Sequence, residues 1–333
     1  MGRRRAVVAA LAVALGALVV PRADAVAAKS PVTSPATRPD PVYNPATRPA
    51  DGAAVRPLPS PLFGVTVDSV SDLGDIVAGA EALPDEPTTR IYFDVRKPAS
   101  YYAAAVRALQ PVSYVMGELL DSSDSRRIGV AAYNKRVRSY LAAFGDEVDV
   151  WEIGNEVNGD WTGRYPKVEA KLTDAYNDVA VAGGRSALTL YYDVGCGDGP
   201  RELDPLAFSR QYVPASVRSG LSYVLLSYYE DECNGIRPSA ATWTAYFEQL
   251  HTLYPDAQVG FGEIGMAEPA TGATLAAARS LMGFYYGLQI PLPYYAGGYF
   301  WWYYDEDCLP VGTGPLWPSL QSGFAAEAAA LAH

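Results

Sequence analysis

Two short motifs place glutamates where β-strands are expected to end. Trp-Glu-Ile-Gly-Asn-Glu-Val-Asn-Gly occupies 151–159 and Gly-Phe-Gly-Glu-Ile-Gly occupies 260–265, so Glu156 and Glu263 form a candidate carboxylate pair. Cleavage of a glycosidic bond uses two such groups, one protonated to assist the leaving oxygen and one ionised to attack the anomeric carbon. Asn155 suits the same site, because its amide can hydrogen-bond a sugar hydroxyl. Taken alone, Asn155 and Glu156 would more commonly be solvated loop residues; the agreement of two strand ends favours catalysis.

The two motifs lie far apart in the sequence, so the fold must bring them into one pocket. Short β-branched or aromatic runs alternate with helical stretches, which is typical of repeated βα units and a parallel sheet. The fold class is therefore predicted as α/β, a single (β/α)8 TIM barrel with the two motifs after strands 4 and 7, at its C-terminal face. A doubly wound open sheet is the alternative, but no Gly-x-Gly-x-x-Gly turn follows the first strand. We predict strands near 63–67, 89–94, 112–117, 148–154, 187–193, 222–228, 258–263 and 296–302, and the clearest helices over 126–143 and 269–288.

The N-terminal region differs in character from the barrel. Met-Gly-Arg-Arg-Arg precedes an apolar run from Ala6 to Val20 and small-residue cleavage sites, so residues 1–27 are predicted as a secretory signal peptide. The run is short for a membrane span, which makes an uncleaved membrane anchor the less favoured interpretation. Residues 28–60 are rich in Pro, Ala and Thr and are predicted as a disordered linker. Residues 61–333 remain for a catalytic domain, and we expect a secreted protein.

Composition limits the partners and cofactors. The chain has 26 basic and 37 acidic residues and a formal net charge of −11. This charge disfavours binding to nucleic acid or to an anionic membrane surface, and it favours neutral or cationic ligands. No metal site and no cofactor are expected, because the cysteine spacings are wide and the only histidines are His251 and His333. We expect a monomer.

Three cysteines lie in a chain whose expected compartment permits disulfides. Cys196 and Cys233 follow predicted strands 5 and 6, which are neighbours in the barrel, so their loops can approach closely enough for a disulfide. Cys308 follows strand 8 and is expected to remain free.

With both motifs in view, the chain resembles the clan A glycoside hydrolases, barrel enzymes that place an Asn-Glu acid/base after strand 4 and a Glu nucleophile at the end of strand 7. Asn155-Glu156 is similar to the strand 4 signature of families of the 39 and 79 types, and Glu263 is similar to their strand 7 ending. The resemblance covers the whole barrel in order and spacing, although each motif is short.

The resemblance also implies roles for residues on other strands. Arg90, in Thr-Arg-Ile-Tyr-Phe-Asp on strand 2, would hold the nucleophile ionised, as an adjacent guanidinium can. Tyr229 would hydrogen-bond the nucleophile, whereas Ser227 stands where many of these enzymes have a histidine. The structural alternatives are an ion pair of Arg90 with Asp94 or Asp68, and a purely packing role for Tyr229.

The strand 8 sequence Phe-Trp-Trp-Tyr-Tyr-Asp at 300–305 offers a tryptophan on which such enzymes stack a sugar. We assign this role to Trp301, with Asp305 four residues later. Only one or two of these aromatic residues can line a cleft, because alternate strand residues face the barrel interior and the helices. Other acids near strand ends are expected to be solvated loop charges, namely Glu118, Asp193, Glu230, Asp231, Glu232, Asp305, Glu306 and Asp307.

The resemblance implies a secreted retaining glycosidase that hydrolyses O-glycosyl bonds of an extracellular polysaccharide or glycan by double displacement. Glu156 would act as acid and base and Glu263 as nucleophile, with their carboxyl groups about 5 Å apart. The alternatives are a catalytically silent carbohydrate-binding barrel and a transglycosidase of the same mechanism.

Overall fold

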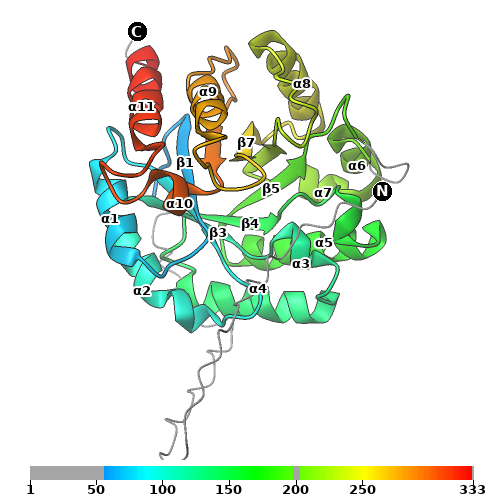
Figure 1. The fold of residues 1–333 in the computed structure, drawn as a ribbon. Helices are drawn as coiled ribbons and strands as arrows, with labels where there is room; N and C mark the ends of the chain where they lie inside the picture. Colours follow the sequence, from blue (N-terminus) through cyan, green and yellow to red (C-terminus); the bar gives the residue numbers. More distant parts are fainter. Residues whose placement is uncertain (1–55, 198–202, 332–333) are drawn as a thin grey trace, which may run out of the picture. The chain divides into compact units, whose positions relative to one another are not determined.

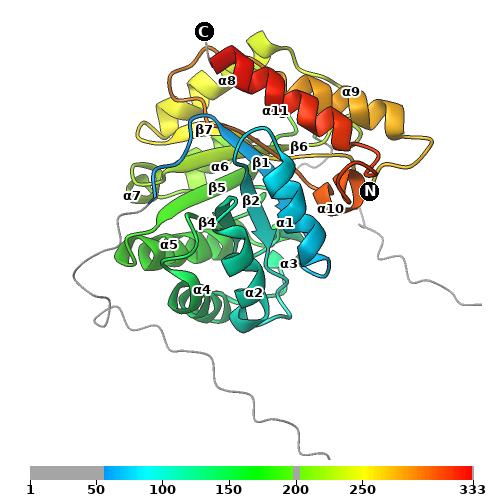
Figure 2. The same ribbon diagram turned by 90° about the vertical axis from the view of Figure 1, so that its left-hand side faces the viewer.

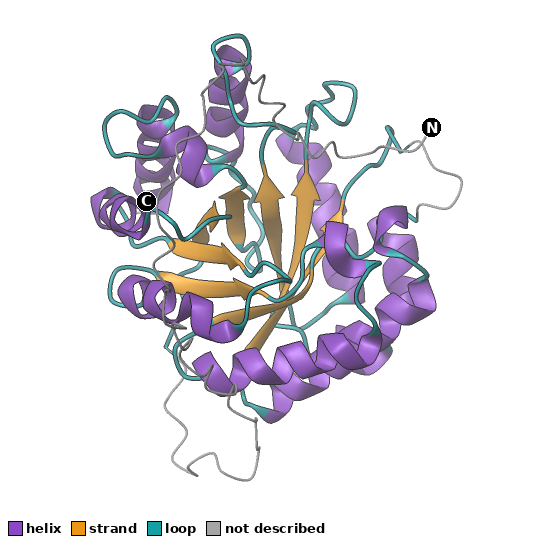
Figure 3. Ribbon diagram, turned by 60° about the horizontal axis from the view of Figure 1, so that its bottom comes forward, coloured by secondary structure: helices purple, strands orange, loops and turns teal. Residues whose placement is uncertain are grey.

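The protein is represented by a computed structural model that describes residues 56–197 and 203–331. The predicted signal peptide and the predicted linker up to residue 55 lie outside the described residues. Within them, eight parallel strands pair in sequence order and close into a barrel (Figure 3). The strands are β1 (Leu62–Val67), β2 (Thr88–Tyr92), β3 (Tyr114–Glu118), β4 (Val150–Gly154), β5 (Arg185–Tyr191), β6 (Tyr223–Tyr228), β7 (Gln258–Ile264) and β8 (Gly297–Trp301).

Helices connect the strands and surround the barrel (Figure 1, Figure 2). The architecture confirms the predicted (β/α)8 barrel, and each predicted strand overlaps an observed one. The helix predicted over 269–288 is longer than the observed helix, since α9 occupies only the middle of this range. The helices are α1 (Leu73–Ala82), α2 (Ala99–Leu109), α3 (Ser122–Ser125), α4 (Val130–Phe144), η2 (Asp160–Thr162), α5 (Tyr165–Val181), α6 (Pro205–Tyr212), α7 (Ala215–Arg218), α8 (Ala240–Leu253), α9 (Leu275–Tyr285), α10 (Tyr304–Cys308) and α11 (Trp317–Leu331).

Inward-facing side chains change from apolar to polar along the barrel. Near the start of the strands the interior holds an apolar cluster of Leu62, Met116, Val150, Ala187, Tyr223, Leu225, Ala296 and Phe300. Because side chains alternate along a strand, the next inward residue lies two positions later. These next residues are polar and buried on four strands, namely Glu118, Glu152, Thr189 and Ser227. A polar layer therefore lies towards the C-terminal face, where active sites of this fold are found.

The last residues of the predicted linker are part of the barrel. Arg56 donates to both carboxylate oxygens of Asp149, at 3.1 and 2.6 Å, and to the backbone carbonyls of Gln110 and Ser113. Leu58 packs against the apolar cluster inside the barrel. Arg56 and Leu58, which the sequence analysis assigned to the linker, are therefore in contact with the barrel.

The loops after β5 and β6 are joined by the predicted disulfide. Cys196 and Cys233 are bonded with a Cα–Cα separation of 5.2 Å, and Cys308 is free and buried. Among the described residues, no helix combines the length and the apolar character needed to cross a membrane.

Candidate active site

Glu263, in β7, is held by donors that come from three other strands. Arg90 Nη1 on β2 donates to Glu263 Oε2 at 3.0 Å, and Asn155 Nδ2, directly after β4, donates to the same oxygen at 3.1 Å. Tyr229, directly after β6, donates its hydroxyl to Glu263 Oε1. The structure thus brings these four residues together, as the sequence analysis expected. Hydrogen bonds of this kind stabilise an ionised carboxylate.

Glu156 lies beside Asn155 in the turn after β4. Its backbone is left-handed, with a φ of 45°, which is unusual for a residue that carries a Cβ. The hydroxyl of Ser122 donates to Glu156 Oε2 at 2.7 Å, and the hydroxyl of Ser227 donates to Oε1 at 2.7 Å. All three side chains are fully buried. Ser227, where the resemblance expects a histidine, therefore contacts the predicted acid/base.

Asn158 fixes the turn that carries Glu156. Its Nδ2 donates to the carbonyls of Tyr191 and Leu203, at 2.8 and 3.0 Å, and its Oδ1 accepts from the Tyr191 amide at 2.7 Å. The turn closes with a bond from the Gly159 amide to the Glu156 carbonyl at 2.9 Å. The sequence analysis did not single out Asn158, although it belongs to the same motif.

A buried ion cluster lies beneath Glu263 in the polar layer. Arg90 Nε donates to Glu152 Oε2 at 2.7 Å, and Arg90 Nη2 lies 3.1 Å from Glu118 Oε2 without the alignment of a hydrogen bond. Thr189 donates its hydroxyl to Glu152 Oε1 at 2.5 Å. Arg90, Glu118 and Glu152 are fully buried. One guanidinium thus faces three carboxyl groups, including Glu263, away from water.

Burial opposes ionisation of two carboxyl groups in this cluster, Glu118 and Glu152. Burial raises the pKa of Glu118 well above its ordinary value, and Arg90 only partly opposes that rise. Burial likewise raises the pKa of Glu152, although Arg90 and Thr189 lower it. Burial lowers the pKa of Arg90, but the three carboxyl groups outweigh this effect and raise it well above the ordinary value. Neither oxygen of Glu118 has a hydrogen-bond partner among the described residues, so burial disfavours the ionised form of Glu118 more than that of Glu152.

One structural alternative and one expectation from the sequence analysis are wrong. Asp94 pairs with Arg96 at 2.7 Å, so Arg90 is not its partner. Glu118 is fully buried instead of being a solvated loop charge, because it faces inward on β3 opposite Glu152 on β4. Alternation along β3 and β4 is the sequence signal that could have identified both buried glutamates.

The stacking role predicted for Trp301 needs correction. Trp301 is fully buried in the core between barrel and helices, and its Nε1 donates to Asp307 Oδ2 at 2.8 Å. A side chain without exposed surface cannot stack on a sugar. The next residue, Trp302, is partly exposed, with its ring 5.4 Å from Arg90 Cζ and edge-on to Tyr92 at 6.1 Å. Trp302 is therefore a partly exposed tryptophan beside the ion cluster.

A second group of carboxyls lies where β1 and β8 end. Carboxylate oxygens of Asp68, Asp305 and Glu306 lie within 4.8 Å of one another, an arrangement that could hold a metal ion but is also common without one. Burial and Asp68 raise the pKa of Asp305 to about 9, and the same two causes raise the pKa of Glu306 to about 7. Crowded carboxyl groups of this kind share protons.

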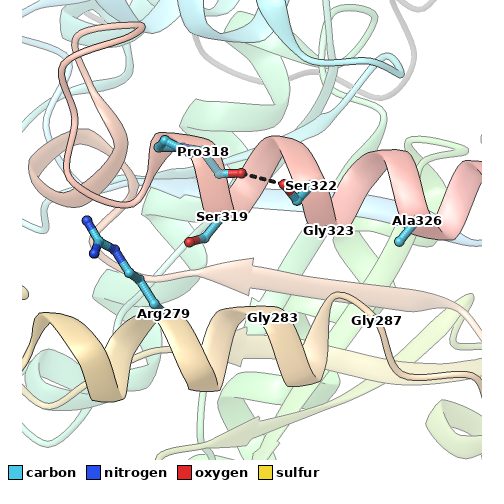
Figure 4. Close-up of a pocket in the computed structure, with 8 residues that line it drawn as sticks. All are labelled: Arg279, Gly283, Gly287, Pro318, Ser319, Ser322, Gly323 and Ala326. Carbon is cyan, nitrogen blue, oxygen red and sulfur yellow. Dashed lines mark hydrogen bonds between the residues drawn. The ribbon is translucent and has the colours of Figure 1, made fainter.

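A groove of about 370 Å³ lies on the outside of the barrel, between α9 and α11 (Figure 4). It contains none of the candidate catalytic residues. Its lining residues are Arg279, Gly283, Gly287, Pro318, Ser319, Ser322, Gly323 and Ala326.

The chain is thus an eight-stranded α/β barrel with a buried carboxylate site towards its C-terminal face. No protein-family model matches the sequence, and no curated protein sequence matches it. Similar solved structures include GH5_18 from Streptomyces cattleya in complex with GlcNAc, at 18% identity over 74% of this chain and 71% of that chain, with a TM-score of 0.54.

Two further structures share the fold. One is a GH10 xylanase from Bispora. sp MEY-1 with xylobiose, at 14% identity over 77% of this chain and 88% of that chain, with a TM-score of 0.50. The other is an endo-beta-1,4-mannanase double mutant from Cellulomonas fimi, at 11% identity over 80% of this chain and 70% of that chain, with a TM-score of 0.51. At these identities the likeness establishes the fold alone.

Proposed function

We propose that this protein is a secreted retaining glycoside hydrolase that cleaves O-glycosidic bonds of an extracellular polysaccharide or glycan. The observation that carries the proposal is the environment of Glu263, which accepts hydrogen bonds from Arg90, Asn155 and Tyr229. Such donors orient the carboxylate and stabilise its charge, as a nucleophile at an anomeric carbon requires.

Two steps follow from this assignment. Glu156 donates its proton to the departing glycosidic oxygen while Glu263 attacks the anomeric carbon, which forms a covalent glycosyl ester. Glu156, now ionised, removes a proton from water, and the water displaces Glu263 with net retention. Asn155 has amide capacity left for a sugar hydroxyl, because only one of its two Nδ2 hydrogens is used by Glu263. Trp302 supplies an aromatic face for the sugar ring.

The similar folds support this proposal by analogy, since their names describe a xylanase and a mannanase. The resemblance to clan A glycoside hydrolases points the same way, through the motifs around Glu156 and Glu263. Affiliation with families of the 39 or 79 type stays a prediction, as does secretion. The disulfide between Cys196 and Cys233 is consistent with an oxidising compartment.

The test uses activated aryl glycosides of several sugars with wild type, Glu263→Gln and Glu156→Gln. Glu263→Gln should lose activity on every substrate. Glu156→Gln should retain the first step where the leaving group needs no protonation, and added azide should restore turnover as a glycosyl azide of retained configuration. Equal losses in the two variants without rescue would refute the assignment of roles.

Wild-type product analysis separates the alternatives. Initial products followed by proton NMR should have the same anomeric configuration as the substrate, whereas inverted products would exclude a covalent intermediate at Glu263. Sugar binding without turnover across the panel would favour a carbohydrate-binding barrel. Transfer to an added sugar acceptor in preference to water would favour a transglycosidase.

A further inference from the structure

Two serines hold the carboxyl group of Glu156 from opposite sides of the site. Ser122 begins α3 after β3, whereas Ser227 lies in β6, and each hydroxyl donates to a different oxygen of Glu156 at 2.7 Å. The backbone amide of Ser122 also donates to Asn155 Oδ1 at 3.1 Å. Ser122 therefore connects both residues of the Asn-Glu pair to α3.

The position of Ser122 is itself fixed by local structure. Asp121 caps α3, because its Oδ1 accepts the backbone amide of Ser123 at 2.8 Å. Ser227 is equally constrained, since it is fully buried within a barrel strand. Neither hydroxyl has a part in the two catalytic steps proposed for Glu156 and Glu263. The hydrogen bonds of both serines to one carboxyl group therefore suggest a separate function for them.

We propose that Ser122 and Ser227 are positioning residues that orient the Glu156 carboxyl group and stabilise its ionised form, and thereby set the upper pH limit of catalysis. This inference rests on the proposed function. A hydroxyl can donate to a carboxylate and, after rotating its hydrogen, accept from a carboxylic acid. A serine hydroxyl can therefore hydrogen-bond the Glu156 carboxyl group in both protonation states that it adopts during each turnover. An ammonium or guanidinium group could hydrogen-bond only the ionised state.

The direction of the effect follows from hydrogen bonding. A bond donated to the ionised form lowers the pKa of a carboxyl group, so removal of one hydroxyl raises it. Glu156 then keeps its proton to higher pH, and the alkaline limb of the kcat/KM profile moves upwards. Among the described residues, the titratable groups in or beside the site include Arg90 on β2, Glu118 on β3, Asp121 before α3, Glu152 on β4, Tyr229 after β6 and Glu263 on β7. All of them remain in every serine variant, so a shift between variants reports the serines.

The experiment compares wild type with Ser227→Ala, Ser122→Ala and Ser227→Thr. The substrate is an aryl glycoside with a poor leaving group, whose cleavage depends on protonation by Glu156. Each alanine variant should move the alkaline limb upwards by about one pH unit. Ser227→Thr restores the hydroxyl and should restore the wild-type limb. With a good leaving group the shift should disappear, because the first step no longer needs the acid.

Ser209→Ala is the matched control. Ser209 is a fully buried serine of α6 whose hydroxyl bonds with Tyr254 and Pro205, outside the candidate site. It should leave the alkaline limb unchanged. An unchanged limb in both Ser122→Ala and Ser227→Ala, or an equal shift in Ser209→Ala, would overturn the inference. If one of the two alanine variants does not fold, as judged by circular dichroism, the other carries the same comparison.

A titration separates this inference from the proposed function. In protein labelled with 13C at glutamate Cδ, the Glu156 signal is the one that disappears in Glu156→Gln. Its titration midpoint should move upwards in Ser227→Ala whether or not any substrate is turned over. An inactive wild type with this shift would refute the proposed function and keep the serine assignment, whereas an active wild type without the shift would do the reverse.

Discussion

Replacement of Arg90 by Met removes the one positive charge that, among the described residues, forms ion pairs with the buried carboxyl groups of Glu118, Glu152 and Glu263. The guanidinium lies 3.1, 2.7 and 3.0 Å from these groups, and all four side chains are almost completely buried. Loss of one partner from a buried ion pair costs about 3–5 kcal/mol, because it leaves uncompensated charge in a region of low dielectric. For a domain of this size, about 2 °C are lost per kcal/mol, so Tm should fall by about 6–10 °C.

The loss of stability in Arg90→Met should depend on pH. Without Arg90, which lowers the pKa values of Glu118 and Glu152, the folded-state pKa values of these two groups rise further above their unfolded values of about 4.3. The stability that each neutral carboxyl contributes is present below the unfolded pKa and is lost as pH rises through the folded pKa. The deficit of Arg90→Met relative to wild type should therefore be small near pH 4 and should grow towards pH 8.

Arg96→Met is the matched control for thermal unfolding across this pH range. Arg96 pairs with Asp94 at 2.7 Å, but its side chain is 82% exposed and screened by solvent, so its loss should lower Tm much less than the loss of Arg90 does. Equal Tm shifts in the two variants, or an Arg90→Met deficit that does not depend on pH, would refute the buried ion cluster.

Three further outcomes are expected. Glu118→Gln removes a carboxyl group whose pKa is raised by burial, so the free energy of unfolding of this variant should increase relative to that of wild type as pH rises above about 4.5. A difference in free energy of unfolding that is the same at all pH values, measured by urea denaturation, would contradict this. Replacement of both Cys196 and Cys233 by Ser opens a loop of sequence separation 37 and should lower the free energy of unfolding by about 4 kcal/mol, with Cys308→Ser as the comparison in urea melts. Trp302→Ala should raise KM at least about tenfold with little change in Tm, whereas Trp301→Ala should cost about 3–5 kcal/mol of stability; the reverse pattern would restore the original assignment.

The barrel and the contacts of Glu263 could be predicted from the sequence because both depend on local patterns. Short apolar runs bounded by turn residues identify strands, and their regular alternation with helical segments identifies a parallel barrel. Strands in such a barrel end at one face, so strand order predicts that the Asn155-Glu156 motif and Glu263 approach each other, whereas the contacts of Arg90 and Tyr229 with Glu263 are implied by the resemblance to clan A glycoside hydrolases. The same argument predicted the disulfide between the loops after β5 and β6, which the structure confirms.

The partners of Glu156 and the correct tryptophan depend on information that strand order does not contain. Ser122 reaches Glu156 from the start of a helix of four residues, which has no apolar periodicity of its own. On β8, the choice between Trp301 and Trp302 depends on which one faces inward. Tyr299 and Phe300, just before them, have φ values of 68° and 43°, and nothing in their residue types predicts a left-handed backbone.

Register shifts in the sheet lie next to residues of the candidate site. The pairing of β4 with β5 shifts between Glu152 and Gly154, and that of β6 with β7 shifts between Leu226 and Ser227. An irregularity of this kind inserts one residue and turns the following side chains to a new direction. Each of these two shifts lies within one or two residues of a group that contacts Glu156 or Arg90. These irregularities are local departures from regular strand pairing that residue types alone do not predict, and they lie next to residues that contact Glu156 and Arg90.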